Sequence, residues 1–582
     1  MHSKKLHDLH VGRHSLNIYR VSCFNQALTC HQMRYASLVL LLLGTACTNV
    51  LEQPSSPDYG VLKIPERPNI LWLVAEDMSP VIPTYGDSTI STPNLSRLAR
   101  EGVQFTHMFS VSGVCAPSRF GIATGVYPTS GGAQHMRTSS RIEYMESIGV
   151  IPYEAVPAPE VRMMSESLRM HGYYTTNNAK QDYQFRAPVT AWDENGNQAH
   201  WRNRPDGMPF FSVFNFGVTH ESQIWRRAAD SLWVEANLDV PIPPYLPDTE
   251  LVRKDVRRMY SNIRILDARI GQMLNQLEAD GLLDKTIIFF YSDHGGPLPR
   301  QKRQLYDSGL HVPLLVRFPE ARLAGTVDSQ LVSFIDLAPT AFSLAGIPLP
   351  AYLEGQAFLG AQRASQPRRY IHAAADRFDT EYDTKRAVRD ARYKYIRNFR
   401  PNRGYYLAVT YREQMASMQE LLRLREEGGL TPAQAQWFRT SKPIEELFDT
   451  QVDPHELNNI ADDPAQTERL MAMREELDTW MAAVNDPGTM PEMEFVATLW
   501  PNHVQPHTTP VTFHREDGQL HLTSATKGAS IGYQVLDKGE SLGTQWQVYT
   551  DPITPGGWHS VHAVAHRIGY APSEPSNFST ND

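Results

Sequence analysis

Three continuous apolar runs, each ending in polar residues, stand out in the first half of the chain. They are "NILWLVAED" (Asn69–Asp77), "PFFSVFNFGVTH" (Pro209–His220) and "TIIFFYSDHGG" (Thr286–Gly296). Runs without alternation are typical of strands buried on both faces of a parallel sheet. From Met259 to Leu277, apolar residues recur at helical spacing and predict an amphipathic helix that leads into the last strand. The pattern therefore predicts an α/β protein whose polar strand ends gather in a crevice at one edge of the sheet.

The pattern changes beyond about residue 400. Residues 412–430 predict an exposed helix, and residues 443–464 predict a strand, a turn and the start of a helix. From about Glu494 the apolar positions alternate in short runs such as "LHLTS", "IGYQVL" and "WQVYTD". Such runs predict an antiparallel β-sandwich appended to the α/β body.

A short apolar run near the N-terminus has the layout of a secretory signal. Arg34 precedes the apolar run Leu38–Leu43, small residues follow, and Cys47 comes next. The run is too short to span a bilayer. It resembles a bacterial lipoprotein signal with Cys47 as the lipidated residue, so we expect export to the periplasm or cell surface and membrane attachment only through a lipid anchor. Translation then starts at Met1 or at Met33. The alternative for this run is an N-terminal core helix.

Composition narrows the remaining possibilities. With 41% hydrophobic and 20% charged residues over 582 positions, the chain is typical of a globular protein with more than one domain. A net charge of −9 argues against a nucleic-acid partner. Of the four cysteines, only Cys115 would remain in the exported body without a disulfide partner or a lipid. It has either a chemical role or the role of a small buried hydrophobe.

The polar strand ends contain groups that bind divalent cations. Glu76 and Asp77 end the first run, and Asp293 and His294 end the third. Hard divalent ions take several oxygen ligands, and Ca²⁺ tolerates irregular geometry, although imidazole is a less typical ligand for it. Acids at a strand end often only face solvent, so this pattern alone leaves a metal site open.

The segment around Cys115 gives these residues a context. "CAPSR" followed by "TG", from Cys115 to Gly125, resembles the signature C/S-x-P-S-R-x-x-x-x-T-G of the type I sulfatases, a family of the alkaline-phosphatase superfamily. Further segments in the family's order extend the resemblance over roughly residues 67–465: "RPNILWLVAED", "SDHGG", "KRQLYDSGLHVPLLVR" and "ELFDTQVDPHELNNIADDP". Details such as "NNAKQDY", "THES" and "DRFD" resemble the sulfamidase-like branch of bacterial polysaccharide sulfatases.

The resemblance implies a specific site. Cys115 would be oxidised to formylglycine (3-oxoalanine) by a formylglycine-generating enzyme or other maturase. One Ca²⁺ would be held by the modified side chain and by four other residues: Glu76, Asp77, Asp293 and His294. Glu76 stands where most members of the family have Asp. The remaining catalytic residues would be an arginine that orients the formylglycine, two sulfate-binding lysines and a general acid: Arg119, Lys180, Lys302 and His220.

In this family one hydroxyl of the aldehyde hydrate attacks sulfur, and the second hydroxyl later expels sulfate. The resemblance therefore implies a covalent mechanism in which cations neutralise the sulfate oxygens and His220 protonates the leaving oxygen. Asp182 stands where most members have a histidine, which leaves one proton-transfer or substrate-binding role open. His135 is a further contact or a structural imidazole, and Arg377 and Asp379 recognise sugar or form a surface ion pair.

The expected organisation is an alkaline-phosphatase-like α/β sandwich with a central mixed, mostly parallel sheet, a smaller α+β C-terminal subdomain and an appended β-sandwich. The expected boundaries are 1–47 for the leader and signal, 48–66 for a tether, 67–400 for the catalytic domain, 401–490 for its subdomain and 491–582 for the β-sandwich. The β-sandwich contacts carbohydrate or buttresses the catalytic domain.

The expected substrate is a sulfated carbohydrate such as the algal polysaccharide ulvan. Alternatives are an N-sulfoglucosamine sulfamidase, a phosphodiesterase or phosphonate hydrolase of the same superfamily, and a non-catalytic glycan-binding protein.

Overall fold

Strand β1 (Asn69–Ala75) is buried along its whole length, as its unbroken apolar sequence predicts. Its side chains alternate between two cores: Trp72 and Val74 belong to one, and Leu71 and Leu73 to the other. The computed structural model describes residues 57, 59, 64–139, 142–554 and 556–579. The predicted signal and the lipidated Cys47 lie outside these residues.

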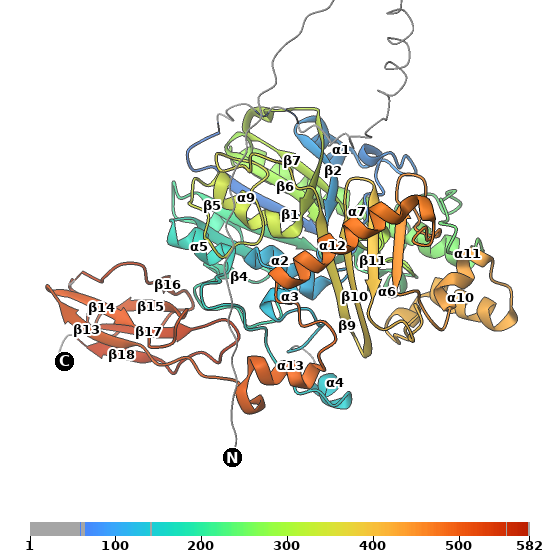
Figure 1. Cartoon of the computed structure of the whole chain (residues 1–582). Coiled ribbons are helices and arrows are strands. Elements are labelled where there is room, and N and C mark those ends of the chain that lie inside the picture. Colours follow the sequence, from blue (N-terminus) through green and yellow to red (C-terminus); the bar gives the residue numbers. More distant parts are fainter. Residues whose placement is uncertain (1–56, 58, 60–63, 140–141, 555, 580–582) are drawn as a thin grey trace, which may run out of the picture. The chain divides into compact units, whose positions relative to one another are not determined.

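Among the described residues, the largest sheet has eight strands in the order β4-β3-β5-β1-β6-β7-β2-β8 (Figure 1). All neighbouring pairs are parallel except the two that involve β7. The expected mixed, mostly parallel sheet is therefore confirmed. Its other strands are β2 (Val103–Phe109), β3 (Tyr174–Asn178), β4 (Glu194–Asn195), β5 (Phe210–Phe216), β6 (Thr286–Ser292), β7 (His311–Arg317) and β8 (Thr326–Ser333).

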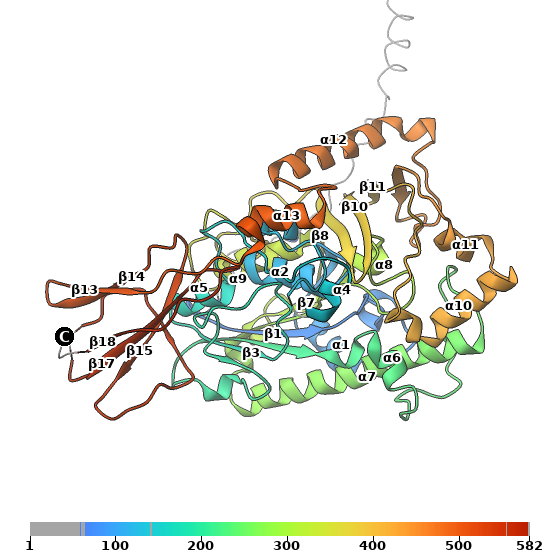
Figure 2. The ribbon, with the colours of Figure 1, turned by 90° about the horizontal axis from the view of Figure 1, so that it is seen from below.

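Helices cover both faces of this sheet (Figure 2). Helices α1 (Pro93–Arg100) and α7 (Glu250–Ala279) pack on the face that holds Leu71 and Leu73. The predicted amphipathic helix lies inside α7, whose apolar stripe meets the sheet. The opposite face carries α2 (Cys115–Thr124), α5 (Met164–Met170) and α9 (Leu337–Leu344). Short helices occur in the connections: α3 (Pro128–Gly131), α4 (Ile142–Ser147), α6 (Ser222–Arg226) and α8 (Asp307–Leu310).

A second, antiparallel sheet has the order β12-β11-β10-β9. Its strands are β9 (Ile371–Phe378), β10 (Glu381–Arg389), β11 (Tyr393–Asn398) and β12 (Glu445–Asp449), and α12 (Thr467–Ala483) packs on it. Three of these strands precede residue 400 and one follows it, so the sheet lies on both sides of the expected boundary at 400. The domain boundaries remain predictions.

Helices α10 (Ala416–Glu427) and α11 (Pro432–Ala435) connect β11 to β12. Helix α10 falls within the predicted helix at 412–430 but is not wholly exposed. Its Met418 and Leu421 are buried in the core that also contains α7.

Two small antiparallel sheets follow α13 (Glu492–Leu499). One pairs β13 (Thr512–Glu516) with β14 (Gln519–Thr523), and the other has the order β16-β15-β17-β18. The strands of this four-stranded C-terminal sheet are β15 (Ser530–Leu536), β16 (Gln547–Val548), β17 (Ser560–His566) and β18 (Ser576–Ser579). Side chains of both sheets, such as Leu520, Leu522 and Val561, share one core, which is the packing expected of a β-sandwich. In the described part of the chain, no helix has the length and apolar character needed to cross a bilayer.

Candidate active site

Cys115 is the first residue of α2 and is completely buried. All ten residues of this helix are buried, which explains why its sequence lacks an amphipathic pattern. Burial alone raises the pKa of the thiol, but the positive charges of Lys180 and Lys302 outweigh it and lower the pKa to about 6. A helix N-terminus also favours negative charge at this position. The site is therefore built to hold an anion at residue 115.

Asp77, Asp293 and His294 converge on Cys115 from the carboxyl ends of the adjacent parallel strands β1 and β6. His294 Nε2 lies 3.0 Å from Asp77 Oδ1 and 3.4 Å from Cys115 Sγ, and Sγ lies 4.0 Å from Asp77 Oδ1. One ligand atom from each of the four residues lies within 4.8 Å of the others. Sequence analysis predicted all four as metal ligands, and the fold brings them together.

Glu76 has a different position. Its Oε2 accepts a hydrogen bond from Lys180 Nζ at 2.9 Å, and Arg119 Nη2 lies 4.0 Å from its Oε1. It falls in a second group of potential ligands with Asp77 and His220 rather than in the group that includes Cys115. Glu76 thus lies beside the predicted metal site, with its charge balanced by Lys180.

The charges of this centre are strongly coupled. Burial opposes ionisation of Asp293, yet Arg119 and His294 lower its pKa to about 2. Burial also disfavours the His294 imidazolium, but Asp77 and Asp293 raise the pKa of His294 to about 10. Asp77 and Asp293 thus provide two buried, ionised carboxylates beside an imidazole, and carboxylate oxygens are the ligands that a hard metal ion takes.

Arg119 and Lys302 each pair with a different one of these acids. Arg119 Nε donates to Asp293 Oδ2 at 3.0 Å, and its Nη1 donates to Asn215 Oδ1 at 2.7 Å. Lys302 Nζ donates to Asp77 Oδ2 at 2.7 Å and lies 3.6 Å from Cys115 Sγ. Each of the two acids therefore has a cation beside it, and Lys302 is also close to Cys115.

His220 follows β5 and lies next to Lys302. Its Nε2 is 3.2 Å from Lys302 Nζ, and its Nδ1 is 2.9 Å from the Ser222 hydroxyl. Glu221, the next residue, donates its backbone N–H to Asp77 Oδ2 at 2.7 Å. This bond fixes the turn after β5, so the imidazole is held beside the acids.

The loop that carries Lys302 packs against Gly113, two residues before Cys115. Arg303 N donates to Gly113 O at 2.8 Å. A Cβ atom on Gly113 would lie 2.4 Å from Gln304 O, too close for any side chain. The glycine in "VSGVC" is therefore required because it lets the Lys302 loop lie against the start of α2.

Asp182 faces the same centre. Lys180 Nζ lies 3.6 Å from its Oδ2, and this buried oxygen accepts no hydrogen bond from the described residues. Lys180 and Arg137 oppose the effect of burial and lower the pKa of Asp182. Asp182 is thus an ionised group with spare acceptor capacity at the edge of the site.

Two further candidate residues are enclosed by protein: Arg377, expected to recognise sugar or to form a surface ion pair, and His135, expected to be a further contact or a structural imidazole. Arg377 is completely buried and pairs with Glu492 through Nε and Nη2, at 2.6 and 2.8 Å. Burial lowers the pKa of His135 to about 4, and its ring lies 3.2 Å from the Arg377 N–H. Asp379 accepts a hydrogen bond from Arg303 at 2.8 Å. Arg377 and His135 are thus held inside the protein, and Asp379, which is partly exposed, is held by Arg303.

Sequence analysis missed three residues that the structure brings to the centre. Asn215 binds Arg119, and Glu221 forms a two-pronged ion pair with Arg303 at 2.8 and 2.9 Å. Asn215 carried a signal, since it interrupts the apolar strand "FFSVFNF". Glu221 and Arg303 gave none, because their pairing joins positions far apart in the chain.

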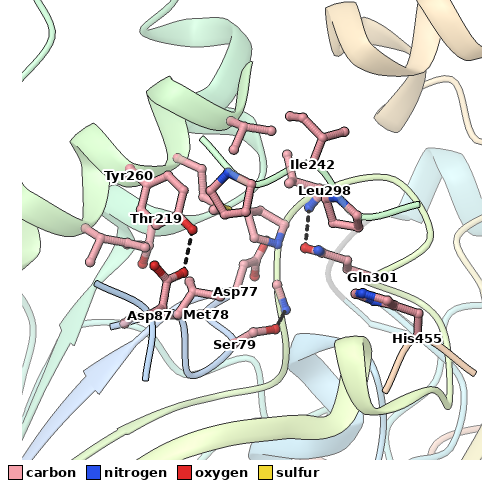
Figure 3. Close-up of a pocket in the computed structure, with 18 residues that line it drawn as sticks. Asp77, Met78, Ser79, Asp87, Thr219, Ile242, Tyr260, Leu298, Gln301 and His455 are labelled. Carbon is pink, nitrogen blue, oxygen red and sulfur yellow. Dashed lines mark hydrogen bonds between the residues drawn. The ribbon is translucent and has the colours of Figure 1, made fainter. Parts of the chain in front are cut away.

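A cavity of about 240 Å³ lies on the α7 side of Asp77 (Figure 3). Its walls are mostly apolar, including Ile242, Met259 and Leu298, and the Tyr260 hydroxyl in it donates to Asp87 at 2.5 Å. Asp77 thus borders a mostly apolar space as well as the charged groups around Cys115.

Comparison with known proteins identifies this arrangement. The model of the Sulfatase family matches residues 68–239 and 197–347, and the model described as "N-sulphoglucosamine sulphohydrolase, C-terminal" matches residues 300–422. An "Ulvan-active sulfatase" of Formosa agariphila is 50% identical over 556 residues, which cover 90% of this chain and 93% of that protein. The chain belongs to the sulfatase family. This sulfatase is accordingly a sulfuric ester hydrolase, as the signature around Cys115 predicted.

More distant relatives agree with the family. The human N-sulphoglucosamine sulphohydrolase is 24% identical over 474 residues, covering 72% of this sulfatase and 91% of that protein. A solved structure titled as a complex with its substrate D-glucosamine-2-N,6-O-disulfate has a TM-score of 0.52 at 16% identity, covering 73% of this sulfatase and 99% of that chain. At such identity the structural likeness supports the fold, and it confirms the expected sulfatase architecture.

Proposed function

We propose that this sulfatase releases sulfate from a sulfated polysaccharide of the ulvan type, using a formylglycine made from Cys115. The identity of 50% over nearly the whole chain with an ulvan-active sulfatase is the observation that carries this proposal. The buried cluster around Cys115 supports the chemistry, because an anionic ester needs cations to approach a nucleophile.

We propose that Asp77, Asp293, His294 and residue 115 hold one Ca²⁺, with Glu76 beside them. The fit rests on two carboxylates and an imidazole gathered within 4.8 Å of Sγ in a buried cavity. When bound, the ion would neutralise sulfate oxygens and the developing charge on the reacting group. When oxidised and hydrated, residue 115 would supply one hydroxyl to attack sulfur and a second to expel sulfate.

The protein's own side chains bind and orient the ester. Lys302, 3.6 Å from Sγ, and Lys180, whose charge acts strongly on the thiol, are positioned to bind sulfate oxygens. Arg119 is held by Asp293 and Asn215 in one orientation, so it can position residue 115. Groups fixed in advance stabilise a transition state without reorganisation at the moment of reaction.

His220 is the general acid in this proposal. It lies within 3.2 Å of Lys302 Nζ and is partly exposed, so it can reach the oxygen of a departing sugar. The contact between its Nδ1 and the Ser222 hydroxyl orients the ring with Nε2 towards the site. Proton donation by a positioned imidazole contributes roughly 10²–10⁴ to the rate.

For the cellular context, we propose export as a lipoprotein anchored through Cys47 and modification by a formylglycine-generating enzyme. The layout of residues 33–47 and the sequence after Cys115 support these two steps. Export would bring the enzyme to a polymer at the cell envelope, and the modification would supply its formylglycine.

Two measurements test the proposed function. After co-expression with a formylglycine-generating enzyme, mass spectrometry should find the Cys115 peptide lighter by the difference between CH₂SH and CHO. Sulfate release should then be fastest from ulvan among ulvan, fucan, carrageenan and heparin fragments. An unchanged thiol in a fully active enzyme would refute the modification, and faster release from N-sulfated heparin fragments would favour a sulfamidase. Faster cleavage of a matched phosphate ester would favour a phosphodiesterase.

A further inference from the structure

A groove of about 700 Å³ lies where residues 181–203 of the catalytic region meet residues Thr544 and Gln545 of the C-terminal sheets. Its floor includes the short edge strand β4, and its far wall is the loop that leads into β16. Two parts of the chain that are more than 300 positions apart thus build one concave surface.

Hydrogen bonds fix the two walls against each other. Arg169 in α5 donates to Trp546 O at 2.6 Å, donates to Thr190 O at 2.7 Å and pairs with Asp193 at 2.8 Å. In β15, Gly532 approaches the same segment so closely that a Cβ on it would lie 2.7 Å from Val189 Cγ2. The groove is therefore held open by a packed contact between the two parts.

The groove adjoins the catalytic centre. Gln181, at one end, lies between Lys180 and Asp182 in the sequence. Trp192 lines the groove and also a small cavity that includes Arg119 and Lys180. Gln181 and Trp192 thus place the groove next to residues of the centre, such as Lys180.

The lining combines polar and apolar surface and carries several amides. The side-chain amides of Gln181, Asn197 and Gln198 have no hydrogen-bond partner among the described residues. Each amide offers donors and acceptors together, which matches hydroxyl groups. Trp192 adds a partly exposed ring that is stacked on Phe211, with centroids 6.1 Å apart.

We propose that this groove binds the unsulfated sugar residues that lie next to the sulfated one in a polysaccharide, with the C-terminal β-sandwich supplying one wall. The proposal rests on the proposed function and specifies its substrate as a chain longer than one sugar. It also gives the β-sandwich a role in substrate binding.

The charges argue for hydroxyl groups rather than a second sulfate. The negative charge of Asp193 is paired with Arg169, and Glu194 accepts a hydrogen bond from Asn203 at 2.8 Å. Arg186 is the exposed cation of the lining. With Asp193 neutralised, Arg186 is balanced by Glu194, so the lining offers no excess of positive charge to a second sulfate.

The experiment compares a short with a long substrate. The full-length, formylglycine-bearing enzyme is assayed with 4-nitrophenyl sulfate, which is too short to reach the groove, and with ulvan oligosaccharides of graded length. The groove variants are Gln545→Ala and the double variant Asn197→Ala/Gln198→Ala. The control is Gln547→Ala, an exposed amide of β16 outside the groove lining.

In wild type and control, KM should fall as the oligosaccharide lengthens. In the groove variants, KM should no longer fall with length. Their KM for long oligosaccharides should be roughly three- to tenfold higher than that of wild type, with kcat unchanged, because the loss of one hydrogen bond weakens binding by about this factor. Their turnover of 4-nitrophenyl sulfate should match that of wild type.

A KM for long oligosaccharides equal to that of wild type in both groove variants would overturn the groove assignment and leave the sulfatase function intact. A wild type that hydrolyses 4-nitrophenyl sulfate but no ulvan fragment would refute the proposed substrate, and the groove assignment with it.

Discussion

The buried pair between Arg377 and Glu492 should be among the strongest contributors to stability. Glu492 lies in helix α13, which follows the sheet β9–β12 in the sequence, and Arg377 lies in β9. The pair therefore ties this helix to that sheet. Both side chains have at most 1% of their surface exposed. Besides Arg377, the Tyr153 and Tyr382 hydroxyls donate to this carboxylate, at 3.0 and 2.5 Å. Four hydrogen bonds therefore converge on one group.

Replacing Glu492 with Ala would remove all four hydrogen bonds and leave the buried guanidinium of Arg377 without its carboxylate. Arg377 Nη1 would keep its bonds to the Met136 and Asp379 carbonyls, but Nε and Nη2 would lose their charged partner. Breaking a buried pair in this way costs about 3–5 kcal/mol of unfolding free energy. Replacing an exposed acid with a neutral residue typically changes the unfolding free energy by no more than about 0.5 kcal/mol.

Denaturant titration followed by tryptophan fluorescence measures the difference. The matched control is Glu494→Ala, an exposed acid two residues away on the same helix. If Glu492→Ala loses no more stability than Glu494→Ala, the argument from burial is wrong. A sugar-binding role for Arg377 would instead predict wild-type stability and a raised KM.

Three further outcomes are expected. Gly113→Ala should lower kcat/KM by at least about tenfold by displacing the Lys302 loop, because misplacement of about 1 Å can cost a hundredfold; Gly557→Ala, whose Cβ meets open space, should match wild type in the same assay. Burial raises the pKa of Asp255 to about 6 from 3.8, so the folded state binds this proton more tightly and the group favours folding more as pH falls from 6 towards 4. In denaturant titrations, the unfolding free energy of Asp255→Asn relative to that of wild type should therefore rise by up to about 3 kcal/mol as the pH is raised from 4 to 8. A difference that does not change with pH would contradict this. His220→Ala should lower kcat by roughly 10²–10⁴ on sugar sulfates but much less on 4-nitrophenyl sulfate, whose leaving group needs no acid; equal losses on both would exclude a general acid.

How much the sequence could predict depends on how local each signal is. The unbroken apolar run of β1 predicts a strand buried on both faces, because no solvent-facing position interrupts it. The acids at the ends of β1 and β6 could be placed together, since adjacent parallel strands end at the same edge. Motif and topology together thus predicted the centre of the site.

Pairings between distant positions could not be predicted in this way. Arg377 in "DRFD" lacks any local mark of its partner, which lies 115 positions further on. The expected boundary at residue 400 followed a change in composition, whereas hydrogen bonding between β11 and β12 continues the sheet across it. Both cases depend on packing that hydrophobic periodicity does not encode.

The burial of helix α2 has a consequence for the order of events in the life of the chain. Cys115 has no exposed surface, and the other nine residues of helix α2 are buried as well. The proposed formylglycine-generating enzyme could not reach this thiol in the folded protein, so we expect it to act on the segment from Cys115 to Gly125 before that segment folds. A molecule that folds before the proposed modification would then keep its cysteine, and we expect it to be stable but inactive.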